Sequence, residues 1–141
     1  MKKMIILGLV AVMLLPLLVT GCGSGSGSTT IEITLDNFSA QTNMVKNVTL
    51  NAQDTLTVKL GSNPSTGFGW EEAVIGNAVI IGQTSRDFIA PTVAGISGAP
   101  GNDVWVFTAK SAGTTTISFK YDRSWETVPA TYTLTINITV K

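Results

Sequence analysis

Residues 132–141 read Y-T-L-T-I-N-I-T-V-K and form the most regular stretch of the sequence. From Tyr132 to Val140 every second residue is hydrophobic, and the positions between them hold threonine or asparagine. Because successive side chains of a β-strand point to opposite faces, this order predicts a strand with one face on a core and the other in water. The stretch therefore indicates an all-β domain.

Three further segments show the same alternation. The inward residues that it predicts are Leu56, Val58 and Leu60; Ile117, Phe119 and Tyr121; and Trp105, Phe107 and Ala109. Shorter strands are expected at residues 31–35, 44–50, 68–74, 78–81 and 85–89, and no helical stripe is visible. Seven to nine short strands with turns between them predict an immunoglobulin-like antiparallel β-sandwich, with Trp70 packed between the sheets. An up-and-down β-barrel is the alternative.

The N-terminus carries the features of an export signal. Lys2 and Lys3 precede an apolar run over residues 4–19, and Thr20, Gly21 and Cys22 follow it. This ending resembles the lipobox of bacterial lipoproteins, in which the signal is removed and the cysteine carries the lipid. We expect a signal peptide at 1–21, lipidation of Cys22, and an exported protein anchored to the bacterial cell membrane or envelope. An ordinary secreted protein and an uncleaved anchor are the alternatives.

The rest of the chain predicts a short tether and one domain. Residues 22–29 hold Cys22 and a Gly/Ser linker, and residues 30–141, about 110 in number, are enough for one domain but not for two. Without Lys2 and Lys3, seven basic and nine acidic residues remain, a net charge of −2. Since no basic cluster is present, we expect no nucleic-acid partner. We expect a monomer.

The composition lacks the side chains of most catalytic sites. Histidine is absent and Cys22 is the only cysteine, so neither a Ser-His nor a Cys-His nucleophile can form. Nitrogen and sulfur ligands for a metal are equally scarce. The adjacent carboxylates Glu71 and Glu72 would point to opposite faces of a strand. We predict that the protein is not an enzyme and has no metal or cofactor; catalysis by scattered carboxylates is the alternative.

Binding in a sandwich is carried by loops at one end, and three loops here have unusual composition. The first loop, residues 63–67, reads N-P-S-T-G; the second, 95–103, is glycine-rich; the third, 122–129, contains Arg123 and Trp125. Pro64 fixes its own φ, and Gly67 permits a positive φ, so we expect a stiff first loop. Arginine and tryptophan are enriched among binding hot spots.

Three motifs in this order resemble the chagasin family of cysteine-protease inhibitors. They are NPSTGFGW, GAPGNDVWVF and AGTTTISFKYDRSW, and the resemblance runs from about Leu35 to Lys141. It implies an immunoglobulin-like fold and reversible inhibition of papain-like cysteine proteases by three loops that enter the active-site cleft. Ser65 and Thr66 would lie nearest the catalytic centre. The implied protease-binding residues are Asn63, Pro64, Ser65, Thr66, Gly67, Gly98, Ala99, Pro100, Gly101, Arg123 and Trp125.

The sequence departs from the family pattern at three positions. Ser65 stands for the usual threonine and lacks its methyl group, and Ser124 stands for a proline, so the third loop should be more mobile. Pro100 stands where the family often has glycine. The alternative function is a non-inhibitory immunoglobulin-like surface module that binds an envelope protein or a cell-wall polymer, with the three loops serving only as turns.

Overall fold

The computed structural model describes residues 25–92 and 98–141. Their elements are β1 (Ser28–Ile33), α1 (Leu35–Ala40), β2 (Asn43–Leu50), β3 (Thr55–Ser62), the 3-10 helix η1 (Pro64–Thr66), β4 (Gly69–Trp70), β5 (Val74–Ile75), β6 (Ile81–Ile89), β7 (Gly101–Ala109), β8 (Gly113–Asp122) and β9 (Tyr132–Val140). The expected signal peptide, Cys22 and Gly95 lie outside the described residues. β1 begins at Ser28, two residues before the expected start of the domain.

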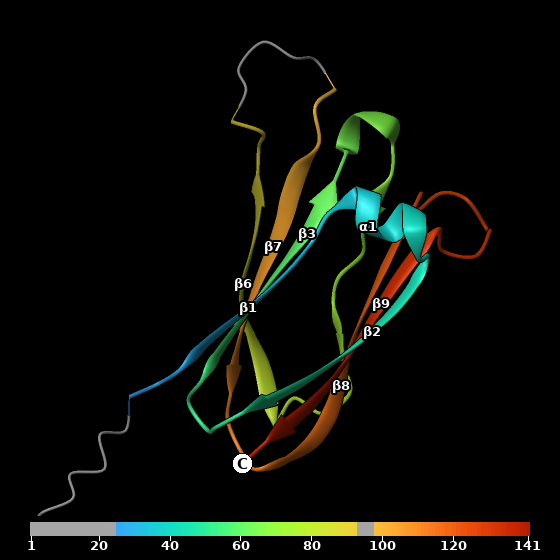
Figure 1. The fold of residues 1–141 in the computed structure, drawn as a ribbon. Helices are drawn as coiled ribbons and strands as arrows, with labels where there is room; N and C mark the ends of the chain where they lie inside the picture. Colours follow the sequence, from blue (N-terminus) through green and yellow to red (C-terminus); the bar gives the residue numbers. More distant parts are fainter. Residues whose placement is uncertain (1–24, 93–97) are drawn as a thin grey trace, which may run out of the picture.

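The strands form two facing sheets, which confirms the predicted sandwich (Figure 1). The first sheet has the order β1-β3-β7-β6, and the second has the order β2-β9-β8-β4, with β5 also paired to β8. Within the described residues, no helix is long and apolar enough to cross a membrane.

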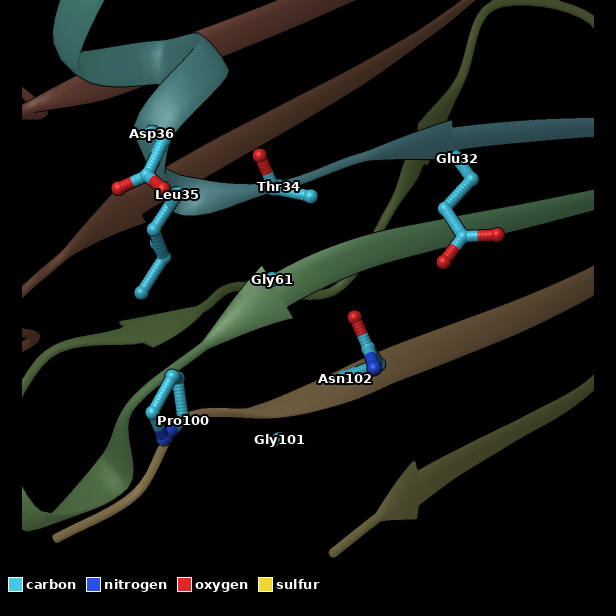
Figure 2. Close-up of a pocket in the computed structure, with 8 residues that line it drawn as sticks. All are labelled: Glu32, Thr34, Leu35, Asp36, Gly61, Pro100, Gly101 and Asn102. Carbon is cyan, nitrogen blue, oxygen red and sulfur yellow. The ribbon is translucent and has the colours of Figure 1, made fainter. Parts of the chain in front are cut away.

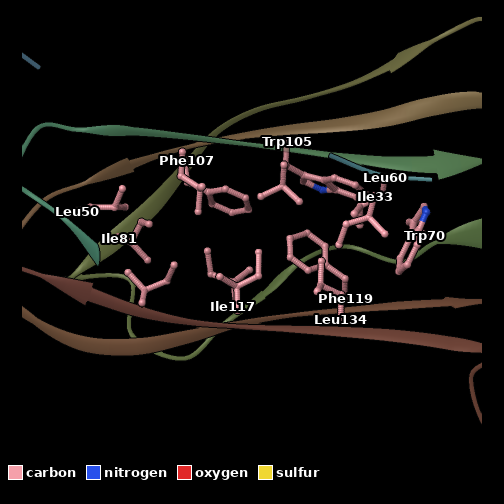
Figure 3. Packing of buried hydrophobic residues seen from close by; sticks show 14 of the residues in the cluster. Ile33, Leu50, Leu60, Trp70, Ile81, Trp105, Phe107, Ile117, Phe119 and Leu134 are labelled. Atoms are coloured by element: carbon pink, nitrogen blue, oxygen red, sulfur yellow. The ribbon is translucent and has the colours of Figure 1, made fainter. Parts of the chain in front are cut away.

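The core lies between the sheets and uses the inward residues that the alternation predicts (Figure 3). Trp105, Phe107 and Phe119 are fully buried, and Trp105 packs edge-on against Phe119 with ring centroids 5.0 Å apart. Each such side chain contributes about 1.5–3 kcal/mol when it leaves water. Trp70 is also buried between the sheets, as predicted. The domain therefore has a continuous hydrophobic core without any disulfide.

Three of the short strand predictions are wrong in detail, and two of them are those at 68–74 and 78–81. The predicted strand 68–74 is broken into β4 and β5, with coil at Glu71 and Glu72. Residues 78–80 form a turn rather than a strand, closed by the backbone N–H of Ile80 donating to the carbonyl of Asn77 at 3.2 Å. Only Ile81 of that prediction is in a strand, where it begins β6. Both corrections concern segments too short to show alternation.

The helix α1 replaces the end of the strand predicted at 31–35. Thr34 caps it: its hydroxyl accepts from the backbone N–H of Asn37, whose side chain accepts from the N–H of Thr34. Phe38 is fully buried, 5.1 Å from the Trp70 ring and 5.3 Å from the Tyr132 ring. A six-residue helix with one buried residue has no visible periodicity, so the sequence did not reveal it.

This helix carries the chain from the first sheet to the second. β1 lies parallel to β3 and β2 lies parallel to β9, whereas the remaining pairs are antiparallel. The prediction of an antiparallel sandwich did not include these two parallel pairs. Parallel neighbours need a crossover connection: β1 reaches β3 through α1 and through β2 of the other sheet, and β2 reaches β9 through the intervening strands β3 to β8.

Strand register decides which loops meet. Ser62, the last residue of β3, lies opposite Gly101, the first residue of β7. Gly69 of β4 lies opposite Asp122, the last residue of β8. The first, second and third loops therefore leave the sandwich at the same end (Figure 1).

The opposite end holds the start of β1 and the end of β9. Ser28 lies opposite Thr55, and Val140 lies opposite Gly113. Asp54 fastens this end: its carboxylate accepts from the backbone N–H groups of Asn51 (2.8 Å) and Gly27 (2.6 Å). These two hydrogen bonds, that of Asn51 first, hold the pKa of Asp54 below its usual value of 3.8.

Candidate functional site

The first loop is the centre of the loop-bearing end, and its backbone is closed on itself. Pro64–Thr66 form the 3-10 helix η1, in which the N–H of Thr66 donates to the carbonyl of Asn63 at 3.1 Å and the N–H of Gly67 to that of Pro64 at 3.0 Å. Gly67 has φ of +80°, which confirms the expected positive φ. Pro64, Ser65 and Thr66 are exposed. The loop is a rigid, solvent-facing projection.

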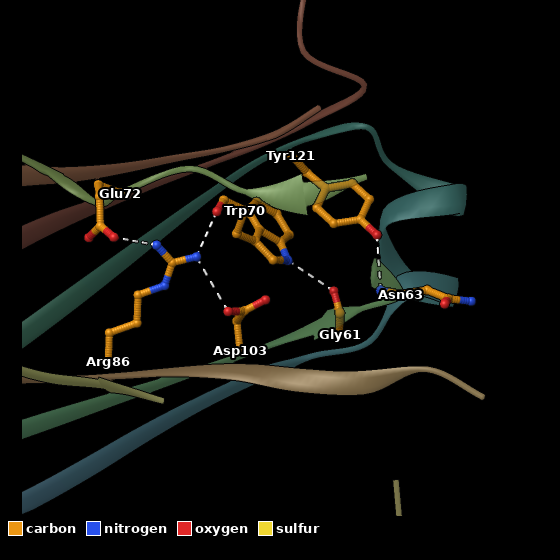
Figure 4. Close-up of polar contacts among 7 residues, drawn as sticks. All are labelled: Gly61, Asn63, Trp70, Glu72, Arg86, Asp103 and Tyr121. Atoms are coloured by element: carbon orange, nitrogen blue, oxygen red, sulfur yellow. Dashed lines mark hydrogen bonds and ion pairs between the residues drawn. The ribbon is translucent and has the colours of Figure 1, made fainter. Parts of the chain in front are cut away.

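Asn63 connects this projection to its surroundings (Figure 4). Its backbone N–H donates to the hydroxyl oxygen of Tyr121 in β8 at 3.1 Å. Its side-chain amide donates to the carbonyl of Gly98 in the second loop at 3.0 Å, and its side-chain oxygen accepts from the hydroxyl of Ser65 at 2.5 Å. One residue therefore joins the first loop to the second and to the sheet.

A second set of contacts joins the first loop to the third. Trp125 lies over Gly67, so that a Cβ atom at Gly67 would be 2.8 Å from Cη2 of the indole. A guanidinium N–H of Arg123 donates to the carbonyl of Thr66 at 3.3 Å. Trp125 is nevertheless 68% exposed, the second-highest value among the large hydrophobic residues that the structure describes. It is positioned by the protein but not buried in it.

Arg123 makes several contacts within the loop-bearing end of the protein. It is half-buried, its guanidinium carbon lies 4.3 Å from the centroid of Phe68, and it pairs with Glu126 at 3.0 Å. The Phe68 ring in turn stacks on Tyr121 with centroids 5.7 Å apart. Arg123 thus braces the third loop against the first.

The second loop contributes unequally to this end of the molecule. Gly98 and Pro100 are exposed and Ala99 is half-buried, whereas Gly101 is buried as the first residue of β7. Residues 101–103 of the expected loop therefore belong to a strand. Pro100 and Gly101 also line a surface pocket of about 320 Å³ that reaches to the start of α1 (Figure 2).

The base of the first loop is fixed by polar contacts across the sandwich (Figure 4). The indole N–H of Trp70 donates to the carbonyl of Gly61 at 2.9 Å. Arg86 of β6 donates to the carbonyl of Trp70 at 2.6 Å and pairs with Glu72 at 2.6 Å. These bonds connect β3, β4 and β6 directly below the loops.

The structure thus brings all eleven predicted site residues to one end, where ten are exposed or half-buried and Gly101 is buried. The sequence pattern predicted Trp70 and Tyr121 as buried residues but did not reveal that they and Phe68 support the first loop, because their partners are distant in the chain. It also missed Phe88, which is exposed beside the second loop. The sequence held a sign of this exposure, because the adjacent hydrophobic residues Phe88 and Ile89 point to opposite faces of a strand and cannot both face the core.

The arrangement has the properties of a binding surface. Among residues 25–92 and 98–141, no group of three or more acidic, histidine or cysteine side chains is placed to hold a metal ion. The first loop offers a hydrogen-bonded backbone with two exposed hydroxyl side chains, Ser65 and Thr66, and the third loop offers the exposed indole of Trp125. Such a preorganised surface loses little conformational entropy when a partner binds.

Known structures share this fold. The cysteine protease inhibitor EhICP2 from Entamoeba histolytica is 21% identical, with a TM-score of 0.65 over 83% of this chain and 100% of that one. PbICP-C, solved in complex with falcipain-2, is 18% identical, with a TM-score of 0.62 over 82% of this chain and 100% of that one. Amebosin is 21% identical, with a TM-score of 0.52 over 70% and 96% of the two chains.

No curated protein sequence matches the chain significantly. The family comparison is decisive, because residues 49–140 match the model described as chagasin family peptidase inhibitor I42. This range spans β3 to β9 and all three loops. As its sequence predicts, the protein is an inhibitor and not an enzyme, and the chain belongs to the chagasin family of peptidase inhibitors.

Proposed function

We propose that the protein is a reversible, non-covalent inhibitor of papain-like cysteine proteases and blocks the active-site cleft with its three loops. The observation that carries the proposal is that the first loop is fastened on both sides, by Asn63 to Gly98 and by Gly67 to Trp125. Two structural relatives are named as a cysteine protease inhibitor and as a partner of falcipain-2, which supports the choice of protease class.

The proposed mechanism is occlusion by shape. Ser65 and Thr66, at the tip of η1, would enter the cleft near the catalytic centre. No group of the inhibitor has to react, because a rigid projection denies the substrate access to the nucleophile. The hydroxyl groups of both residues already hydrogen-bond to Asn63, at 2.5 Å for Ser65 and 2.7 Å for Thr66. The conformational entropy of the first loop is thus lost when the protein folds and not when it binds its partner.

The flanking loops would contact the rims of the cleft. Gly98, Ala99 and Pro100 would line one side, and Trp125 the other, with Arg123 holding the third loop in place. A protease inhibitor of this kind typically buries about 800 Å² on each partner. The binding surface is exposed without any rearrangement of the sandwich, which fits a protein that acts as a monomer.

The proposed location is the bacterial cell membrane or envelope, with a lipid on Cys22. The described chain begins at Gly25, at the end of the sandwich opposite the loops (Figure 1). A tether at that end leaves the three loops pointing away from the membrane. Replacing Cys22 with serine should release the protein from membranes in a cell fractionation, and retention of the variant would contradict the anchor.

The inhibitory function is tested with residues 22–141 carrying Cys22→Ser, which contain every element of the described fold. The protein should inhibit papain at micromolar concentration or below and leave a serine protease such as trypsin unaffected. Absence of papain inhibition would favour a surface module that binds another envelope component.

A further inference from the structure

Hydrophobic side chains are exposed on both sides of the polar first loop. Trp125 and Val128 of the third loop are 68% and 57% exposed. On the other side, Phe88 and Ile89 at the end of β6 are 47% and 48% exposed. Figure 1 shows the β6–β7 hairpin on one side of η1 and the chain after β8 on the other. The first loop therefore stands between two hydrophobic surfaces.

Phe88 lies on the face of the hairpin that is turned toward the second sheet. In the register of β6 and β7, Arg86 lies opposite Trp105 and Phe88 lies opposite Asp103. Trp105 is fully buried and Asp103 is 8% exposed, whereas Phe88 at the end of the strand is 47% exposed. Ile89 lies opposite Asn102, and because neighbours in a strand alternate, its side chain points to the other face.

The ring of Phe88 packs against Gly101. A Cβ atom at Gly101 would lie 2.6 Å from Cζ of Phe88 and 2.5 Å from the carbonyl oxygen of Ile89. The absence of a side chain at position 101 therefore lets the ring rest against the strand. A side chain that packs on its own strand has less freedom to lose on contact with a partner, and aromatic residues are enriched in the cores of interfaces.

We propose that Phe88 is a further protease-contacting residue and that it determines affinity together with Trp125. The two side chains form hydrophobic contacts on either side of the first loop, and the partner surface is a hydrophobic rim of a papain-like protease cleft. This inference rests on the proposed function. The position of Phe88 next to the proposed binding surface supports the inference. The hairpin that bears Phe88 also bears Gly98, which is hydrogen-bonded to Asn63 of the first loop.

The chain offers a matched control in the neighbouring residue, since Ile89 is equally exposed but faces the other way. Phe88→Ser should raise the inhibition constant for papain about tenfold or more, as expected for loss of an interfacial aromatic. Ile89→Ser should change it by less than about threefold. Both variants should keep a melting temperature within a few degrees of the parent protein.

Phe88→Leu separates a contact role from a structural one, because it keeps most of the hydrophobic surface. It should recover most of the affinity lost in Phe88→Ser. If the parent protein inhibits papain and Phe88→Ser inhibits it equally well, or if Ile89→Ser is impaired to the same degree, the proposed role of Phe88 is wrong. If the parent protein does not inhibit papain at all, the proposed function fails independently of Phe88.

Discussion

Trp125 rests on Gly67, and the space for a Cβ atom at position 67 is occupied by the indole ring at 2.8 Å. This contact ties the shape of the first loop to the position of the third. Gly67 is required for two reasons, since its φ of +80° is also unfavourable for other residues. The same glycine thus sets the backbone of one loop and seats the exposed aromatic of another.

Gly67→Val should impair inhibition more than it impairs folding. The positive φ costs about 1–2 kcal/mol in stability, while the displaced indole and first loop should raise the inhibition constant by a factor of about 100. Inhibition assays against papain and thermal unfolding measure the two effects. Gly69→Ala is the control, because a Cβ atom at Gly69 meets nothing within 4 Å. Equal damage to stability and inhibition would mean that Gly67 has a structural role only.

Trp125→Ala should weaken inhibition by about 2 kcal/mol or more, as expected for an interfacial anchor. Because the side chain is 68% exposed, the melting temperature should change little. Val79→Ala is a matched control, since Val79 is 69% exposed and lies far from the loops. An unchanged inhibition constant for Trp125→Ala would remove this residue from the binding surface.

Arg123→Met tests whether this side chain acts by bracing. The variant loses the hydrogen bond to Thr66 and the contact with Phe68, and should lose about 1 kcal/mol of stability and about tenfold in inhibition. Arg123→Lys should also inhibit less well than the parent protein, because a single ammonium group cannot contact Thr66 and Glu126 together as the planar guanidinium group does. Lys59→Met, which removes an exposed pair with Glu32, should have no effect on inhibition. Full activity of Arg123→Met would contradict the bracing role.

The lowered pKa of Asp54 should make the stability of the folded protein depend on pH. Its pKa in the folded protein is lowered below 3.8 by the N–H groups of Asn51 and Gly27, so the ionised carboxylate stabilises the fold above pH about 4. This stabilisation is lost as the pH falls through the folded pKa. Urea unfolding from pH 7 to pH 2.5 should therefore show a difference between the parent protein and Asp54→Asn that shrinks in acid. A difference independent of pH would mean that the carboxylate charge does not contribute.

Much of the fold follows from local sequence pattern. Alternation correctly placed the inward residues of β3, β7, β8 and β9, such as Leu56 and Ile136, because each of these strands has one buried and one solvent-facing side. Alternation does not specify a partner strand, so the parallel pairs of β1 and β2 could not be inferred. The helix α1 was missed because its single buried residue, Phe38, gives no period.

The sequence predicted which residues form the candidate site but not which residues contact one another within it. Pro64 and Gly67 predicted a constrained first loop, and the positive φ of Gly67 was expected because glycine adopts this conformation readily. The bracing role of Arg123 depends on Phe68 and Thr66, more than fifty residues away, which no local pattern reports. The burial of Gly101 depends in the same way on Phe88 and Ile89, which lie against it from the neighbouring strand.

The most direct test of the account is the fate of both partners after prolonged incubation of papain with residues 22–141 carrying Cys22→Ser. A cleft plugged by shape predicts inhibition at a one-to-one ratio that persists for hours, an inhibitor that stays uncleaved on a gel, and recovery of papain activity on dilution. Cleavage within the first loop with return of activity, or no inhibition at micromolar concentration, would contradict it.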